Sequence, residues 1–156
     1  MTAASSGFDA DGWVDMDNWA FVNGTIPYGS GILLDTANAD VAVTFAGQVA
    51  SDDSEITSVA GFNFTGNNTP VSINVQDVTV GGENVTDGSD NIQILDEGGA
   101  TTATYVYMTA ASSGFDADGW VDMDNWAFVD VTLTPGQGIL VDTANAGVSI
   151  VIPSAL

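Results

Sequence analysis

The stretch MTAASSGFDADGWVDMDNWAFV occupies residues 1–22, and the same residues recur without a change at 108–129. Residue n of the first copy corresponds to residue n + 107 of the second. The match then loosens, but GILLDTANADVAV (31–43) still parallels GILVDTANAGVSI (138–150). The chain therefore holds a first copy (1–49), a second copy (108–156) and a single stretch between them. A period of this length is typical of one β-domain per repeat.

The local patterns indicate β-structure throughout. Turn formers such as Gly98-Gly99 and Pro135-Gly136 separate short runs that alternate apolar and polar residues. We expect an all-β chain built of β-sandwich modules, immunoglobulin-like or jelly-roll-like, or a closely related barrel. A change of apolar phase at Gln76-Asp77 predicts a β-bulge. The expected strands are VAVTF (41–45), VSINV (71–75), NIQIL (91–95), AFVDVTL (127–133) and VSIVI (148–152).

The order copy, central segment, copy predicts an incomplete unit. We expect a half-module at 1–49, a linker at 50–57 and a complete module at 58–156 that contains the second copy. One central segment can complete only one copy, so the other keeps unpaired strand edges. This favours strand exchange between identical subunits, head to tail, with GVSIVIPSAL (147–156) as a donor strand. The alternative is two self-sufficient small domains in a monomer.

The composition excludes most classes of site. The chain has no Lys, Arg, His or Cys, and its 21 Asp and Glu residues give a net charge of −21. Catalysis by a Ser-His-Asp triad, Schiff-base chemistry and zinc sites of His and Cys are thereby excluded. Nucleic acid is not an expected partner, because its phosphates need cationic side chains. No run approaches the ~18 apolar residues of a membrane helix, so membrane insertion is not expected.

The repeated segment FDADGWVDMDNW predicts calcium binding. It carries alternate aspartates around a glycine, which resembles the middle of an EF-hand-like or dockerin-like calcium loop. It departs from that loop because Gly7 and Asn18 stand where the first and last acidic ligands belong. The alternative is a solvated hairpin in which Asp and Asn shape the turn. The candidate ligands are Asp9, Asp11, Asp15, Asp17, Asp116, Asp118, Asp122 and Asp124.

The four tryptophans of the repeat are predicted to pack in a core or as anchors between subunits, because their rings bury large apolar areas. They are Trp13, Trp19, Trp120 and Trp126.

Two enzyme classes can work with carboxylates alone. ILLDTAN (32–38) and ILVDTAN (139–145) resemble the Asp-Thr-Gly motif of pepsin-like and retroviral proteases, but Ala37 and Ala144 replace its glycine. A strand that ends in an Asp-Thr turn is favoured instead. Glycoside hydrolysis by a carboxylate pair needs a cleft for which the split repeat leaves little room. We expect no enzymatic activity.

Four Asn-x-Ser/Thr sequons predict exposed turns that could carry glycans in a glycosylating, secreting organism. Their asparagines are Asn23, Asn63, Asn67 and Asn84.

The stretches NIQILDEGGATTATYVYM and DGWVDMDNWAFVDVTLTPGQGILVDTA resemble Asp/Gly-rich tandem β-modules of large bacterial cell-surface and secreted proteins of uncharacterised function. The resemblance implies an extracellular, structural role, with 58–156 as one module and 1–49 as the end of a preceding one. We therefore expect an extracellular structural subunit that forms a filament, tube or surface lattice with calcium support. The alternatives are a carbohydrate-binding or adhesin module and a halophile's soluble protein.

Overall fold

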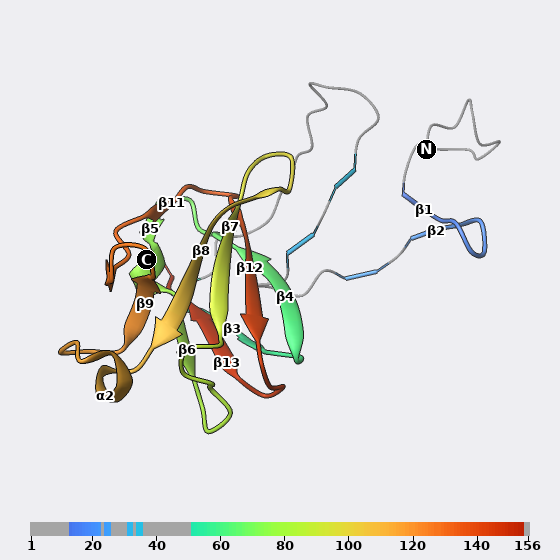
Figure 1. The fold of residues 1–156 in the computed structure, drawn as a ribbon. Helices are drawn as coiled ribbons and strands as arrows, with labels where there is room; N and C mark the ends of the chain where they lie inside the picture. Colours follow the sequence, from blue (N-terminus) through green and yellow to red (C-terminus); the bar gives the residue numbers. More distant parts are fainter. Residues whose placement is uncertain (1–12, 23, 26–30, 33, 36–50, 155–156) are drawn as a thin grey trace.

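The computed structural model describes residues 13–22, 24–25, 31–32, 34–35 and 51–154 (Figure 1). These described residues are nearly all β, with 42% strand and 6% helix, which confirms the all-β prediction. Within these residues the helices are η1 (Val75–Asp77) and α2 (Ala110–Ser113), each about one turn long. Neither of these short helices could cross a membrane.

The largest sheet has six antiparallel strands in the order β10-β9-β8-β7-β12-β4. Three of its strands, β10, β9 and β12, come from the second copy, and the other three come from the central segment (58–107). In sheet order they are β10 (Ala127–Phe128), β9 (Gly119–Asp122), β8 (Thr101–Met108), β7 (Asn91–Leu95), β12 (Gly138–Thr143) and β4 (Gly61–Gly66).

Three smaller sheets accompany it in the part of the chain that the structure describes. A three-stranded sheet has the order β3-β13-β6, and two further sheets are the pairs β11-β5 and β1-β2. Figure 1 shows β1 and β2 standing apart from the other sheets. The bounds are β3 (Ser54–Thr57), β13 (Ser149–Ile152), β6 (Thr79–Gly81), β11 (Thr132–Leu133), β5 (Ile73–Asn74), β1 (Val14–Asp15) and β2 (Ala20–Phe21).

The sheets built from residues 51–154 share one hydrophobic core. Because side chains alternate along a strand, Ile92 and Ile94 of β7 both face inward. β12 contributes Ile139 and Val141 in the same way, and Ile150 comes from β13 of the three-stranded sheet. Strands of the central segment and of the second copy thus share this core.

Two local predictions were wrong. The phase change at Gln76-Asp77 is not a bulge but η1, which Asn74 caps by accepting a hydrogen bond from the Gln76 backbone N–H. Residues 54–57, expected in a linker, form β3 and pair along β13, where the Ser54 side chain is buried. A polar run such as SEIT can serve as an edge strand because only one of its faces meets the core.

The run AFVDVTL (127–133) is divided into β10 and β11, which belong to different sheets. The predicted strand VAVTF (41–45) lies outside the described residues.

Candidate functional site

The repeated hairpin has the same internal pairing in both copies. Its two short strands are antiparallel, and the partners correspond one to one at the offset of the repeat. The pairs are Val14↔Phe21 and Asp15↔Ala20 in the first copy, and Val121↔Phe128 and Asp122↔Ala127 in the second.

An aspartate organises the turn of this hairpin. In the second copy, Asp122 Oδ1 accepts the backbone N–H of Asp124 at 2.9 Å and Asp122 Oδ2 accepts Asn125 Nδ2 at 2.7 Å. The turn ends at Trp126, whose φ of 50° is uncommon for a residue other than glycine. The first copy repeats these features with Asp15, Asp17 and Asn18 at the same distances and with Trp19 at a φ of 55°.

The surroundings of the two hairpins differ most at the tryptophan immediately before the first paired residue, which is Trp13 in the first copy and Trp120 in the second. Trp120 is 0% exposed, and its indole Nε1 donates to the Val78 carbonyl at 2.6 Å. The ring of Tyr107 meets it edge to face, with the centroids 5.3 Å apart. The Gln76 side chain binds both backbone groups of Trp120. Gln76 Oε1 accepts the Trp120 N–H at 3.1 Å, and Gln76 Nε2 donates to the Trp120 carbonyl.

The corresponding residue of the first copy, Trp13, is 66% exposed. Val14 is half-buried, although its counterpart Val121 is completely buried. The sequence predicted core or inter-subunit positions for all four tryptophans, and Trp120 alone is buried. Because both copies have the same sequence here, no local signal could have separated them. Trp120 is buried and Trp13 is exposed because residues of the central segment cover only Trp120.

A second contact holds the start of the second copy. Asp87 of the central segment accepts the Thr109 backbone N–H at 3.0 Å on one carboxylate oxygen and the Thr109 hydroxyl at 2.8 Å on the other. Hydrogen bonds from Ser112 and Thr109 lower the pKa of Asp87 below its usual value.

Burial raises the pKa of Tyr107, and the negative charges of Asp118 and Asp87 raise it further. A folded-state pKa above the unfolded value means that unfolded tyrosine loses its proton first, so stability should fall as the pH rises above about 10. The chain has no Lys, Arg, His or Cys, so its three tyrosines are the only side chains that titrate there. Urea unfolding between pH 8 and 12 measures this loss. In Tyr107→Phe the part of the pH dependence of the unfolding free energy that comes from Tyr107 should vanish. An unchanged pH dependence would contradict its assignment to Tyr107.

The candidate calcium ligands do not converge in the part of the chain that the structure describes. No group of three or more acidic side chains suited to a metal ion occurs among those residues. Asp118 accepts the Ala110 N–H at 2.8 Å, Asp122 shapes its turn, and Asp116 and Asp124 are exposed. Asp9 and Asp11 lie outside the described residues, and calcium binding stays a prediction.

The sequon asparagines have different environments. Asn67 is 1% exposed, and its side-chain amide donates to the carbonyls of Val71 and Leu133, so a glycan there would have to displace both bonds. Asn63 is half-buried and Asn84 is exposed. Asn23 lies outside the described residues.

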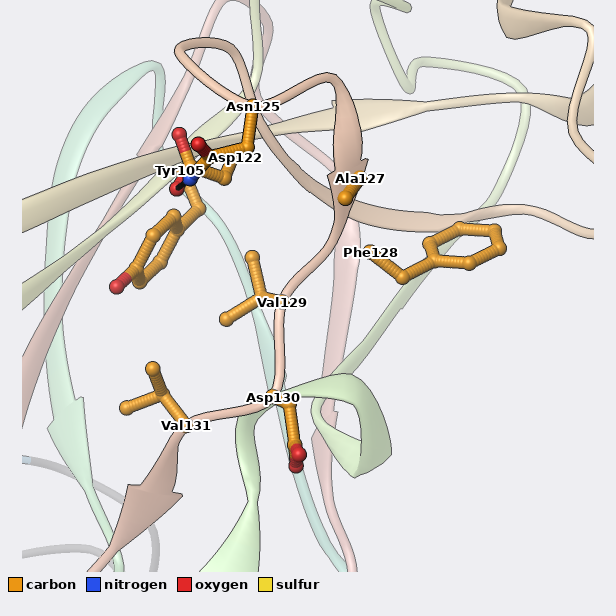
Figure 2. Close-up of a pocket in the computed structure, with 8 residues that line it drawn as sticks. All are labelled: Tyr105, Asp122, Asn125, Ala127, Phe128, Val129, Asp130 and Val131. Atoms are coloured by element: carbon orange, nitrogen blue, oxygen red, sulfur yellow. Dashed lines mark hydrogen bonds between the residues drawn. The ribbon is translucent and has the colours of Figure 1, made fainter.

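A shallow hollow of about 240 Å³ lies beside the hairpin of the second copy. In Figure 2, Tyr105, Val129 and Val131 border it, whereas the ring of Phe128 points away. Its volume falls below the roughly 300–1,000 Å³ of typical small-molecule pockets. The hollow therefore does not indicate a ligand site.

The structure describes both aspartates of the protease-like motif, Asp35 and Asp142. Asp142 lies on β12, opposite Asn91 and Phe62 of the neighbouring strands, and Asn91 Nδ2 donates to it at 3.4 Å. Asp35 is exposed.

The first copy also meets the edge strand β4. Gly31, the counterpart of Gly138 on β12, donates its N–H to the Phe64 carbonyl at 3.0 Å. A Cβ at Gly31 would stand 2.9 Å from the Phe64 carbonyl carbon, so this approach requires glycine.

Comparisons with protein-family models, curated proteins and solved structures found no match. The resemblance to tandem surface modules therefore stays a prediction, and the repeated hairpin is the feature from which a function can be inferred.

Proposed function

We propose that the protein is an extracellular structural subunit that assembles with identical copies into a filament, tube or surface lattice by β-strand complementation. One observation carries the proposal: the strand that holds the first tryptophan of the repeat is buried in the second copy, where Trp120 and Val121 are 0% exposed, whereas Trp13 in the first copy is 66% exposed. The second copy shows which environment this sequence takes up within a complete module. The first copy lacks that environment, and in the proposed assembly it forms the contact between one subunit and the next, here called the joint.

The exposed apolar surface of the first copy favours association. Large exposed apolar patches on soluble proteins commonly mark interaction sites, because burying them removes apolar area from water at about 25 cal/mol per Å². Single exposed apolar residues would not carry this weight, but here they belong to one short segment. They are Trp13, Met16, Trp19, Phe21 and Val22. Among their counterparts in the second copy, Trp120 and Val129 are buried, whereas Met123, Trp126 and Phe128 are exposed, so the apolar area that docking would bury lies chiefly at Trp13 and Val22.

The charge sets the conditions for assembly. A net charge of −21 without one cationic side chain makes identical subunits repel one another. Cations must screen this repulsion, and calcium at the Asp-rich turns is the proposed source of the strongest compensation.

Assembly should respond to cations. We expect light scattering and negative-stain images of the purified protein to show polymers in millimolar calcium, and these polymers should thin or dissolve when a chelator is added. Sodium chloride at matched ionic strength separates general screening from calcium binding, because the Debye length is equal in the two buffers. A protein that stays monomeric in calcium and in high salt would contradict self-assembly. Polymers that form equally well in both salts would contradict only the calcium part.

A carbohydrate-binding or adhesin module is the second candidate, since exposed rings such as Trp13 and Trp19 could stack on sugars. A monodisperse monomer that binds glycans, with binding lost in Trp13→Ala, would support this alternative. No catalytic activity belongs to either proposal.

A further inference from the structure

We propose that the first copy docks onto the central segment (58–107) of a second molecule and there takes the place of that molecule's own second copy. This inference rests on the proposed self-assembly and names its joint. The partner is another molecule of this chain. The exchange is a domain swap in which the first copy of one molecule replaces the second copy (108–156) of the other.

The chain itself displays the complementary surface. In the closed module, Trp120 is bound by the carbonyl of Val78, the side-chain amide of Gln76 and the ring edge of Tyr107. All three partners belong to the central segment. Trp13 carries the same indole and the same backbone groups, ahead of a hairpin with the same pairing. A central segment that accepts the second copy therefore offers the same recognition groups to the first.

Over the identical residues, the exchange breaks and forms the same contacts. Residues 1–22 and 108–129 are identical, so a central segment cannot distinguish the copies over this part of the interface. Its own second copy holds the advantage of being tethered, which corresponds to an effective concentration on the order of millimolar for a short linker. Swapped joints should therefore accumulate at high protein concentration, or after refolding from urea at high concentration.

The stoichiometry gives the joint a direction. Each chain has one central segment and two copies, so a molecule can accept a first copy from one neighbour and donate its own to another. Such a head-to-tail contact produces an open chain unless its rotation closes a ring. Both partners are anionic, so added salt should raise the yield of joints.

Disulfide cross-linking can test the joint, because the native chain has no cysteine. In the closed module β8 pairs with β9, and Val106 stands opposite Val121. Val14 is the counterpart of Val121 in the first copy. Directly paired residues of adjacent strands lie within the Cα separation that a disulfide requires. A disulfide between Val14→Cys and Val106→Cys would therefore report a first copy seated on a central segment.

The decisive experiment mixes two single variants of the full chain. Val14→Cys and a mass-tagged Val106→Cys are combined at high concentration in salt, oxidised, and separated on a non-reducing gel. We expect a heterodimer joined through these two cysteines, with a yield that rises with concentration and salt. The double variant Val106→Cys/Val121→Cys is the matched control and should form the same bond within one chain, which shows that the geometry and the oxidant are adequate.

The outcomes separate this inference from the proposed function. If the control cross-links and the mixed variants do not, the docking inference is overturned, whether or not images show polymers. Polymers without the cross-link would leave self-assembly standing with another joint. A monomeric Val14→Cys/Val106→Cys double variant closed by an internal disulfide would also overturn the inference, because the exchange would then occur within one chain. Cross-linked closed dimers without polymers would support the docking and contradict the filament.

Discussion

Replacing Trp120 by alanine is expected to lower the free energy of unfolding by about 3–5 kcal/mol, the usual range for a large core aromatic. The same replacement at Trp13 should change it by less than about 0.5 kcal/mol in dilute solution, as for a typical surface site. The two positions have the same neighbours in sequence over the whole repeated stretch. The difference between the variants therefore measures tertiary burial alone.

The physical reason lies in what surrounds Trp120. The alanine variant would leave a cavity beside Tyr107, and it would leave the Val78 carbonyl without its indole donor. An unsatisfied buried acceptor adds about 1–3 kcal/mol to the loss of apolar contact. At Trp13, which is mostly exposed, neither penalty arises.

Urea unfolding at low protein concentration and moderate salt measures both variants. Trp120→Phe should give an intermediate loss, because it retains a ring but not the N–H donor, and it serves if Trp120→Ala does not fold. Equal losses at the two positions would show that the first copy is buried in the same way as the second. At high protein concentration, Trp13→Ala should weaken assembly and leave the stability of the module unchanged.

Asn67→Ala is expected to lower the free energy of unfolding by about 2–4 kcal/mol, since it would leave several buried backbone groups without partners. The Asn67 amide donates to the carbonyls of Val71 at 2.8 Å and Leu133 at 2.9 Å. Its Oδ1 accepts the Thr69 N–H at 3.0 Å and the Thr69 hydroxyl at 2.7 Å. One side chain thus joins the end of β4 to β11 of the second copy.

The neighbouring Asn68 provides the matched control because it is exposed. Asn68→Ala should alter stability by less than about 0.5 kcal/mol. Thermal or urea unfolding of the two variants gives the comparison. A small loss for Asn67→Ala would mean that water replaces the amide at little penalty, and that this asparagine does not secure the second copy.

Part of the fold was predictable from local pattern. NIQIL (91–95) forms β7 over the same residues because the alternation of its apolar side chains matches the two faces of a strand. VSINV (71–75) was only partly predicted, since the hydrogen bond that Asn74 accepts ends β5 after Asn74 and starts η1. A capping side chain can outweigh β-propensity over two or three residues, and an apolar pattern does not report it.

The candidate site was only half predictable. The alternation of aspartates predicted either a calcium loop or a turn-shaping hairpin, and Asp15 and Asp122 make the bonds of the turn. The partners that cover Trp120 could not be found from the repeat, because Gln76 and Val78 lie far from it in the sequence and belong to the unrepeated segment.

The sequence by itself determined the hairpin. Its turn is closed by hydrogen bonds between residues two to four positions apart, so two identical stretches adopt the same register and the same uncommon backbone angle at Trp19 and Trp126. Such bonds need nothing from the rest of the chain.

Tertiary structure alone decided that Trp120 is buried and Trp13 is exposed. β8 ends at Met108 and β9 begins at Gly119, so the second copy reaches the central segment by closing a loop of roughly ten residues. The first copy would have to close one of roughly eighty residues between β2 and β8, which costs about 2 kcal/mol more in chain entropy. The two copies compete for one central segment. The second copy binds it because its connection is shorter, and Trp13 of the first copy remains exposed to water.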